Sequence, residues 1–563
     1  MTEQGITADH PPPVRGTGGT GRAGRRWPGQ RSARGRRRGA PAAAALLAGV
    51  LALAVAVGPT PSTAAAPADR ASPATGGRAR FVPGPCPETP EPVPGRCGFL
   101  EVPESRERHQ HGERGGPGER GGGRTLRLAV AIVPAVSATP AADPVVFMEG
   151  GPGGDAFGSI PFLIGSGVNR DRELIVMAQR GTLHAQPNLA CPEIDRFNAT
   201  AVGLRYDAPS TGRLLVRAAR ECRDRLTADG VDLSAYNTTE NAADFAALRT
   251  ALGVERWNVY GYSYGTELAL TYLRLHPRGI RSVAIDSVVP PQVVSLPWTW
   301  DSAREGIGAI LAACAAQPRC GSRYPDLPDT LTRQVRRLEE HPLRVTAQPP
   351  AGGEPVQVVL DGGALVNLLV ANAVKAVDVP AALDELAHGN PERFARAQAA
   401  GATPVIGEFA HGLTQSVACA EWVPGHSEAD LLRAGRRAFP DWPDTVLAQA
   451  PQLPFEHDVC RVWNVPDRTG VQRVATRSDV PTLIVSGSFD AKTGASWGPF
   501  TARTLPRSTT VLIPGTGHFV VPQSPCAQSV LASFLVAPTA PDTGCVAGLA
   551  PPPFTITPET DTA

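Results

Sequence analysis

Short apolar runs alternate with segments of helical periodicity along most of this sequence. Six runs have the length and the Val, Ile and Leu content of buried strands, at residues 144–148, 173–177, 257–260, 281–285, 481–485 and 509–513. Between them, apolar side chains recur at helical spacing, as in residues 241–252 and 266–275. This alternation predicts an α/β fold, with a mostly parallel central sheet covered by helices on both faces.

The pattern changes between residues 291 and 474, where helical segments dominate, for example at 302–316, 327–340, 364–374 and 428–438. We expect these residues to form a helical cap. It would be inserted between the first part of the sheet domain, at 85–290, and its C-terminal part, at 475–545. Two opening strands, within 86–102 and 125–134, would flank a polar loop at 104–124. A flexible tail is expected at 546–563.

The first 66 residues predict an export signal, and residues 67–84, rich in Pro, Ala and Gly, a flexible spacer. An arginine-rich segment ends at Arg38, an Ala/Leu/Val segment runs from 40 to 57, and small residues precede Ala66. We expect cleavage near Ala66 and a secreted product with no stable membrane association. The alternative is a membrane anchor, although eighteen Ala-dominated residues are short for a span. Paired arginines leave the Sec and twin-arginine routes both open.

The charge balance argues against a nucleic-acid partner. Nine arginines against two acidic residues give the first 66 residues a net charge of +7, which leaves about −6 of the formal total of +1 for the rest. A mildly acidic body offers no basic surface for phosphates. With 42% hydrophobic and 19% charged residues, the chain has the composition of a globular protein.

Ten cysteines support the prediction of export. None forms a C-x-x-C pair and their spacing fits no zinc site, so we expect no metal. An even number in an exported chain indicates disulfides, and pairing neighbours in order is the simplest of many possible connectivities. Reduced core thiols are the alternative. The cysteines are Cys86, Cys97, Cys191, Cys222, Cys314, Cys320, Cys419, Cys460, Cys526 and Cys545.

One strand–turn–helix stretch carries the strongest chemical signal. Ser263 is the centre of a G-x-S-x-G motif, Gly261 to Gly265, between the apolar run at 257–260 and the helical pattern at 266–275. A serine on such a sharp turn has its hydroxyl pushed outward, and flanking glycines let neighbouring backbone approach. The amide of Tyr264, at the start of the helix, would face an oxyanion formed beside Ser263. Ser263 is therefore the candidate nucleophile.

A nucleophilic serine needs a base and an acid, and both types of residue follow later strands. His518, the one histidine beyond residue 481, comes directly after the run at 509–513. Asp490 follows the run at 481–485. In enzymes with this kind of serine turn, the partners come in the order Ser, acid, His. Because the carboxyl ends of parallel strands share one edge, we expect Ser263, Asp490 and His518 to meet there.

A glycine-rich loop, residues 150–154, follows the run at 144–148, where a second oxyanion donor is expected. Its glycines would let the amide of Gly151 face a substrate carbonyl. A phosphate-binding loop is the rival interpretation. It is disfavoured because the spacing is neither G-x-G-x-x-G nor a Walker pattern ending in Lys-Ser/Thr.

These motifs together resemble a known family. GGPGG, QRGT, the block YNTTENAADFAALRTALGVERWNVYGYSYGT, PTLIVSGSFD and GTGH are similar to the α/β-hydrolase branch of prolyl iminopeptidases and secreted tripeptidyl aminopeptidases. ACAAQPRC, SVACAEW and the CAQSV ending resemble the cap and C-terminal region of the second group. The resemblance spans residues 86–545. Ala178, Leu183 and Glu149 depart from the family pattern near the expected substrate mouth.

The resemblance implies an α/β-hydrolase fold with an inserted helical cap, and Ser263, Asp490 and His518 as the catalytic triad with Gly151 and Tyr264 as oxyanion donors. It also implies release of short peptides or single residues from peptide N-termini, without a cofactor. We expect a monomer that acts on peptides. An exported esterase or lipase-like hydrolase and a non-catalytic peptide-binding relative are the alternatives.

An aminopeptidase must also hold the substrate ammonium, which buried carboxylates do best. Three acidic residues are candidates for that contact: Glu421, Glu149 and Asp286.

Overall fold

The computed structural model describes residues 79–106, 124–403 and 406–557. The expected export signal, residues 67–78 of the expected spacer and most of the expected polar loop lie outside these residues. Within them, the central sheet has ten strands in the order β1-β2-β3-β5-β4-β7-β8-β11-β12, with β6 paired to β3. The strands are β1 (Arg80–Gly84), β2 (Arg96–Pro103), β3 (Thr125–Val133), β4 (Val145–Met148), β5 (Leu174–Met177), β6 (Ala185–Gln186), β7 (Trp257–Tyr262), β8 (Ile280–Asp286), β11 (Thr482–Gly487) and β12 (Ser508–Ile513).

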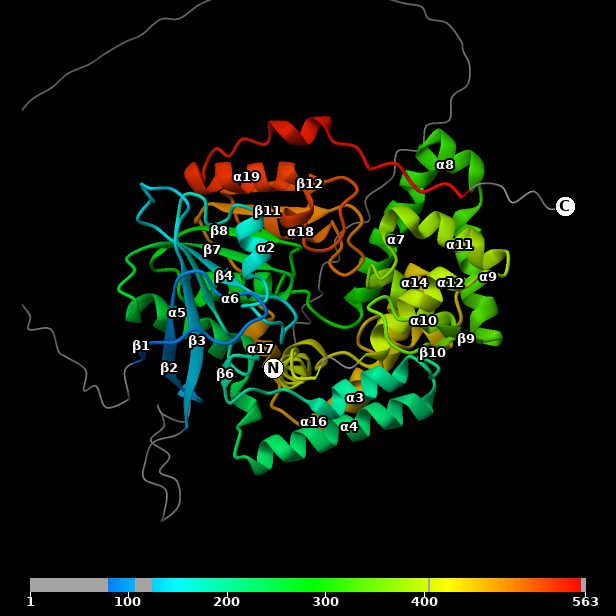
Figure 1. The fold of residues 1–563 in the computed structure, drawn as a ribbon, viewed down its shortest axis with the longest axis horizontal. Helices are drawn as coiled ribbons and strands as arrows, with labels where there is room; N and C mark the ends of the chain where they lie inside the picture. Colours follow the sequence, from blue (N-terminus) through cyan, green and yellow to red (C-terminus); the bar gives the residue numbers. More distant parts are fainter. Residues whose placement is uncertain (1–78, 107–123, 404–405, 558–563) are drawn as a thin grey trace, which may run out of the picture. The chain divides into compact units, whose positions relative to one another are not determined.

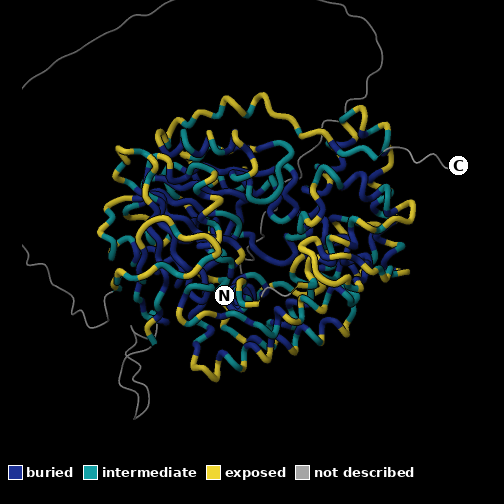
Figure 2. Tube along the Cα trace, in the orientation of Figure 1, coloured by how far each residue is buried: buried dark blue, intermediate teal, exposed yellow. Residues whose placement is uncertain are grey.

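All six apolar runs form strands of this sheet, and these strands are parallel from β5 to β12. Except for β12 at the sheet edge, they are almost fully buried because both faces are covered, and alternate side chains enter different cores. Val146 and Met148 of β4 pack with α5 and α6, whereas Val145 and Phe147 pack with α2 and α19. Figure 2 shows buried residues concentrated inside the molecule and exposed residues on its outer turns.

Most helices of the sheet domain lie in the segments that connect these strands, and the last ones follow β12 (Figure 1). They include a long α4 and the α6 that follows the serine turn. The helices and short helical turns are α2 (Ile160–Gly165), α3 (Pro192–Ala201), α4 (Pro209–Ala228), η1 (Leu233–Ala235), α5 (Thr238–Ala251), α6 (Tyr264–Leu275), α18 (Trp497–Ala502), η5 (Val521–Gln523), α19 (Pro525–Val536) and η6 (Gly544–Gly548).

The segment between β8 and β11 has its own hydrophobic core and, in addition to helices, a small antiparallel sheet. Figure 1 shows most of its helices beside the central sheet rather than on its faces. The elements are α7 (Trp298–Ala316), α8 (Pro318–Arg323), α9 (Leu327–Glu340), β9 (Leu343–Ala347), β10 (Val356–Leu360), α10 (Gly362–Val370), η2 (Ala376–Asp378), α11 (Val379–Ala387), α12 (Glu392–Ala399), η3 (Ala400–Ala402), α13 (His411–Val417), the π-helical η4 (Ala418–Trp422), α14 (Glu428–Ala438), α15 (Asp444–Leu447), α16 (Glu456–Trp463) and α17 (Thr469–Gln472).

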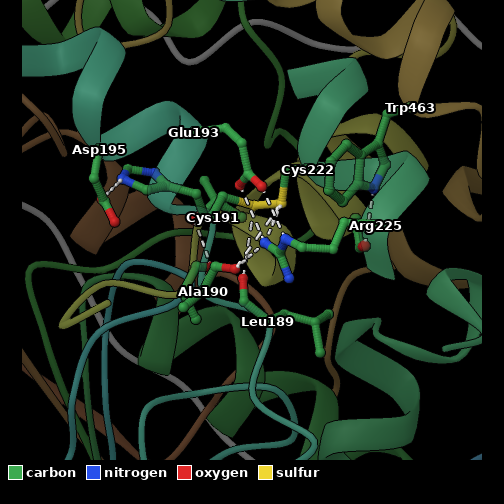
Figure 3. The surroundings of a disulfide bond; sticks show 12 residues. Leu189, Ala190, Cys191, Glu193, Asp195, Cys222, Arg225 and Trp463 are labelled. Atoms are coloured by element: carbon green, nitrogen blue, oxygen red, sulfur yellow. Dashed lines mark hydrogen bonds and ion pairs between the residues drawn. A yellow bond between two sulfur atoms is a disulfide. The ribbon is translucent and has the colours of Figure 1, made fainter. Parts of the chain in front are cut away.

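All ten cysteines are paired, each with its neighbour in the sequence. The bonds are Cys86–Cys97, Cys191–Cys222, Cys314–Cys320, Cys419–Cys460 and Cys526–Cys545. Figure 3 shows the bond between α3 and α4, with the Glu193–Arg225 ion pair beside it at 2.8 Å. In the described part of the chain, no helix is long and apolar enough to cross a membrane.

Two segments expected to be flexible make defined contacts. β1, at the end of the expected spacer, pairs antiparallel with β2, and its Phe81 packs against the core. Residues 546–557 of the expected tail lie against the inserted segment. Phe554 is buried, the Thr555 amide donates to the Val377 carbonyl at 3.0 Å, and Phe489 lies 6.2 Å from the Phe554 ring. A buried aromatic side chain and several hydrogen bonds thus anchor a segment whose composition suggests a free end.

Candidate active site

Ser263 lies on a strained turn between β7 and α6. Its backbone has φ 55° and ψ −128°, a conformation that non-glycine residues rarely adopt. The two glycines of the motif are required by close packing. A Cβ at Gly265 would lie 1.9 Å from the Met148 carbonyl oxygen, and one at Gly261 would lie 2.4 Å from that of Gly265. The fold thus holds the Ser263 hydroxyl at the carboxyl end of the sheet.

The structure brings Ser263, His518 and Asp490 together from three separate loops. His518 Nε2 lies 2.9 Å from Ser263 Oγ, and His518 Nδ1 lies 2.8 Å from Asp490 Oδ2. Asp490 follows β11 and His518 follows β12, which are adjacent parallel strands. The geometry is that of a nucleophile, a base and a group that orients the base.

Asp490 is kept ionised by the groups around it. Burial alone would raise its pKa, but the nearby His518 and the hydrogen bonds from His518 and Thr493 outweigh that effect, so the pKa lies below its usual range. Thr493 donates its hydroxyl to Asp490 at 2.6 Å and its amide at 2.9 Å, and the Lys492 amide donates at 2.9 Å. A carboxylate with these donors is fixed in position and faces the imidazole.

Asp286, a candidate for the substrate amine, supports the His518 loop instead. Its two oxygens accept the amides of Val520 and Val521 at 2.9 and 2.8 Å, the Ser287 hydroxyl at 3.1 Å and the Tyr260 hydroxyl at 3.3 Å. Burial raises its pKa to about 6, although the two amides oppose that shift. With four donors on it, this carboxylate has no acceptor site left for an ammonium.

The glycine-rich loop after β4 lies directly against the serine turn, because β4 and β7 are neighbours in the sheet. A Cβ at Gly150 would lie 2.9 Å from Ser263 Cβ. Gly151 has φ 112°, which favours glycine. The amides of Gly151 and Tyr264 form no hydrogen bond to another described residue. The two expected oxyanion donors therefore have unused hydrogen-bonding capacity: Tyr264 follows Ser263 directly, and Gly151 follows the Gly150 that packs against it.

Glu149, the second candidate for the amine, directly precedes this loop. Its Oε1 accepts the Gly150 amide at 2.7 Å, and its Oε2 accepts the Ser159 hydroxyl. Burial raises the pKa of the Glu149 carboxyl to about 7, although both hydrogen bonds oppose the shift. An ionised carboxylate has about four acceptor sites, so this one can accept further hydrogen bonds.

Glu421, the third candidate, lies in the π-helical η4 and is 1% exposed. It accepts the Thr238 amide at 2.8 Å and the Thr238 hydroxyl at 2.6 Å. Burial raises its pKa, against the effect of the Thr238 bonds. Glu421 thus joins the inserted segment to the N-terminus of α5, and it too keeps acceptor capacity.

Two other places could be mistaken for ligand sites. A cavity of about 940 Å³ lies between α4 and α16, but no triad residue lines it. Two groups of described residues bring three potential ligand atoms within 4.8 Å of one another, Cys191–Glu193–Cys222 and Cys419–Glu456–Cys460. In each group the cysteines are joined in a disulfide, so neither offers a thiolate.

The sequence analysis missed several contributors to the site. Thr493 had a local signal, since a threonine three residues after an aspartate is the spacing of a side chain-capped turn. The Gln523 side chain donates to the carbonyls of His518 and Phe519 at 2.6 Å each. Tyr262 stacks on Phe519 with ring centroids 3.8 Å apart. The contacts of Gln523 and Phe519 arise from the folded loop and have no pattern in the sequence.

Comparisons with known proteins agree with this architecture. Residues 143–313 match the family model for the alpha/beta hydrolase fold, and residues 450–547 match that for TAP-like proteins. The sheet topology, the serine turn and these matches define the chain as a serine hydrolase with the α/β-hydrolase fold. Its C-terminal region is TAP-like, and the chain is similar to tripeptidyl aminopeptidases and proline iminopeptidases.

Three relatives illustrate the range of sequence identity and coverage among these similar proteins. The chain is 23% identical over 400 residues to the serine protease Hip1 of Mycobacterium tuberculosis, a match that covers 66% of this chain and 74% of Hip1. It is 26% identical over 211 residues to the tripeptidyl aminopeptidase of Streptomyces lividans, 36% of each chain. It is 34% identical over 87 residues to the probable proline iminopeptidase of Streptomyces coelicolor, 15% of this chain and 27% of the relative. The match thus spans about a quarter to three quarters of these relatives.

Among solved structures, the proline iminopeptidase of Mycobacterium smegmatis matches 74% of this chain and 96% of its own, at 18% identity and a TM-score of 0.35.

Proposed function

We propose that this protein is an exported aminopeptidase that cleaves short peptides or single residues from peptide N-termini through Ser263, His518 and Asp490. The single observation that carries the proposal is the 2.9 Å contact between His518 Nε2 and Ser263 Oγ, with Asp490 on the opposite ring nitrogen. The similarity to peptidases supports the substrate class. The five disulfides support export, because such bonds persist outside the reducing cytosol.

The reaction begins when His518 takes the Ser263 proton while Oγ attacks the carbonyl carbon of the scissile bond. The oxygen of the tetrahedral intermediate accepts hydrogen bonds from the amides of Gly151 and Tyr264. His518 then protonates the leaving amine, and an acyl-enzyme remains. Water, deprotonated by His518, attacks this ester and releases the N-terminal fragment with Ser263 restored.

We assign recognition of the substrate ammonium to Glu149. Asp286 has its acceptor sites filled, whereas Glu421, like Glu149, keeps acceptor capacity but binds Thr238 at the start of α5 rather than the glycine-rich loop. Glu149 precedes Gly150, which contacts Ser263, and it has acceptor capacity left. A carboxylate beside the loop that packs against the nucleophile favours cleavage close to a free N-terminus.

A matched substrate panel tests the proposal. The same peptide amides are assayed with free and with acetylated N-termini, beside simple esters. We expect kcat/KM to favour the free N-terminus. Preference for blocked peptides would contradict the aminopeptidase assignment, and preference for esters would favour an esterase.

The Glu149→Gln variant tests the amine site. We expect KM for free peptides to rise by about tenfold or more, the value of a charge-assisted hydrogen bond, with no change for blocked ones. Glu421→Gln is the matched control. If Glu421→Gln alone produces the selective rise, the ammonium binds at Glu421.

A further inference from the structure

We propose that the continuous helix His411–Trp422, formed by α13 and η4, sets the positions of both oxyanion donors, with Thr414 as the positioning residue for the glycine-rich loop. This inference rests on the proposed function, because it takes Gly151 and Tyr264 as the donors. According to this inference, the inserted segment contributes to the chemical step by positioning the oxyanion donors, in addition to any role in covering the site.

The first end of this helix holds the loop at residues 150–154. The Thr414 hydroxyl donates to the Pro152 carbonyl at 2.6 Å, and the Ala410 amide donates to the Gly153 carbonyl at 2.9 Å. The packing is close on both sides of the loop. A Cβ at Gly153 would lie 2.7 Å from the Ala410 carbonyl oxygen, and one at Gly151 would lie 3.3 Å from the Phe409 ring. The backbone that presents the Gly151 amide is thus fixed from outside the sheet domain.

This end of the helix is itself anchored to the sheet domain. The Gly412 amide donates to the Leu189 carbonyl at 2.9 Å, and His411 Nε2 lies 3.1 Å from Asp195 of α3. A Cβ at Gly412 would lie 2.7 Å from the same Leu189 oxygen, so the helix approaches as closely as backbone atoms allow. The Cys191–Cys222 disulfide joins α3 to α4 beside this contact. Thr414 therefore projects from a support that is fixed in position.

The second end holds the residue that bears the other donor. Glu421 binds the amide and hydroxyl of Thr238, and that hydroxyl lies 3.0 Å from the Tyr264 hydroxyl. Trp422 donates from its indole to Glu267 of α6 at 3.1 Å, and its ring lies 6.3 Å from that of Tyr264. The same helix thus holds the side chain of Tyr264, the residue whose backbone amide is taken to face the oxyanion. π-helical turns such as η4 occur often at functional sites.

Thr414 is the contact that a single substitution can remove cleanly. Its side chain is 8% exposed, and its hydroxyl reaches the Pro152 carbonyl across the boundary between the inserted segment and the loop. Valine has the same shape without the hydroxyl, so it would leave a buried carbonyl unpaired and release the loop. Loss of one oxyanion donor typically slows the chemical step by about 10²–10³-fold, so a partial displacement is expected to cost less than that.

The test is the rate at which a fluorophosphonate labels Ser263, because this probe needs the oxyanion donors and has no ammonium. We expect Thr414→Val and Thr414→Ala to label about tenfold more slowly, and Thr414→Ser, which restores the hydroxyl, within about twofold of the unmodified enzyme. With a peptide substrate, kcat should fall by the same factor while KM stays within about twofold. Thr501→Val is the control, since Thr501 is a buried helical threonine whose hydroxyl binds its own helix at Trp497.

The outcomes separate the inference from the function on which it rests. Labelling of Thr414→Val at the unmodified rate would overturn the inference, as would a Thr414→Ser variant as slow as Thr414→Val. Equal slowing in Thr501→Val would also overturn it, because the effect would then be one of general stability. If Ser263→Ala is labelled as rapidly as the unmodified protein, the proposed function itself fails. At the second end, Glu421→Ala is expected to slow labelling in the same way, and an unchanged rate would limit the role of the helix to the loop.

Discussion

The Asp490 carboxylate and the His518 imidazole lie 2.8 Å apart on loops that follow neighbouring parallel strands. Asp490 is 1% exposed and holds the ring through Nδ1, which leaves Nε2 directed at Ser263. The register of β11 and β12 brings the two loops to the same edge of the sheet. The donors on Asp490, and the bonds of Asp286 and Gln523 to the His518 loop, then fix the pair in position.

Replacement of Asp490 by Asn is expected to lower kcat by roughly three to four orders of magnitude. An amide in that position would present an NH₂ group to donors and favour the wrong tautomer of His518. Steady-state kinetics with a free-amine peptide measures the effect, and Asp479→Asn, at an exposed position, is the control. A loss of less than tenfold would mean that Asp490 does not orient the base.

Gly265→Ala is expected to prevent correct folding or to lower the melting temperature sharply. Its Cβ would lie 1.9 Å from the Met148 carbonyl oxygen, a distance that forces β4 and α6 apart. Gly308→Ala is the matched control, since it lies in a helix with nothing within 4 Å of the added Cβ. Removal of the conformational freedom of glycine should stabilise that helix by about 0.5–1 kcal/mol. Thermal unfolding of both variants tests the account, and equal behaviour would contradict it.

Glu456→Gln is expected to change how stability depends on pH. Burial raises the pKa of Glu456 to about 8, against the effect of its hydrogen bond with Gln415. Because the folded-state pKa exceeds the unfolded one, the contribution of this group is fully present at low pH and is lost as the pH rises from about 4.5 to about 8. The variant should therefore gain stability relative to the unmodified protein across that window, by on the order of a few kcal/mol.

Thermal melting at pH 5, 6, 7 and 8 measures the difference in stability between the Glu456→Gln variant and the unmodified protein. Glu428→Gln is the control at an exposed position. A constant difference between the Glu456 variant and the unmodified protein over this range would show that Glu456 does not titrate as described.

Removal of the Cys419–Cys460 bond is expected to cost more stability than removal of Cys314–Cys320. The two bonds close loops of 41 and 6 residues. Loop-closure entropy predicts losses of about 4 and about 2 kcal/mol when both cysteines are replaced by Ala. Urea denaturation of the two double variants compares them, and an equal or reversed order would contradict the entropic explanation.

Much of the site could be predicted because the sequence carries it in local patterns. The strand runs predict which loops share an edge of the sheet, and that placement is sufficient to bring Ser263, Asp490 and His518 together. The glycines at 261 and 265 can be recognised as a sequence motif, because close backbone contacts at these positions exclude a Cβ. The fold class and the parallel strands follow from periodicity alone.

The remaining features depend on contacts between distant segments, which composition does not encode. The composition of residues 546–557 suggests a free end, yet buried Phe554 and hydrogen bonds to Gln317, Val377, Asp378 and Tyr324 anchor them. From the sequence, Asp286 is an available carboxylate, but its neighbours in the fold supply four donors that occupy it. Thr414 has no motif at all, because its partner is a carbonyl 262 residues away.

The most direct test of the central claim is to label the protein with a fluorophosphonate and map the modified residue by mass spectrometry. We predict a single adduct on Ser263, absent in Ser263→Ala and strongly reduced in His518→Ala, with both variants folded as judged by thermal melting. An adduct on another residue, or labelling of Ser263→Ala at the unmodified rate, would contradict the assignment of Ser263 as the nucleophile.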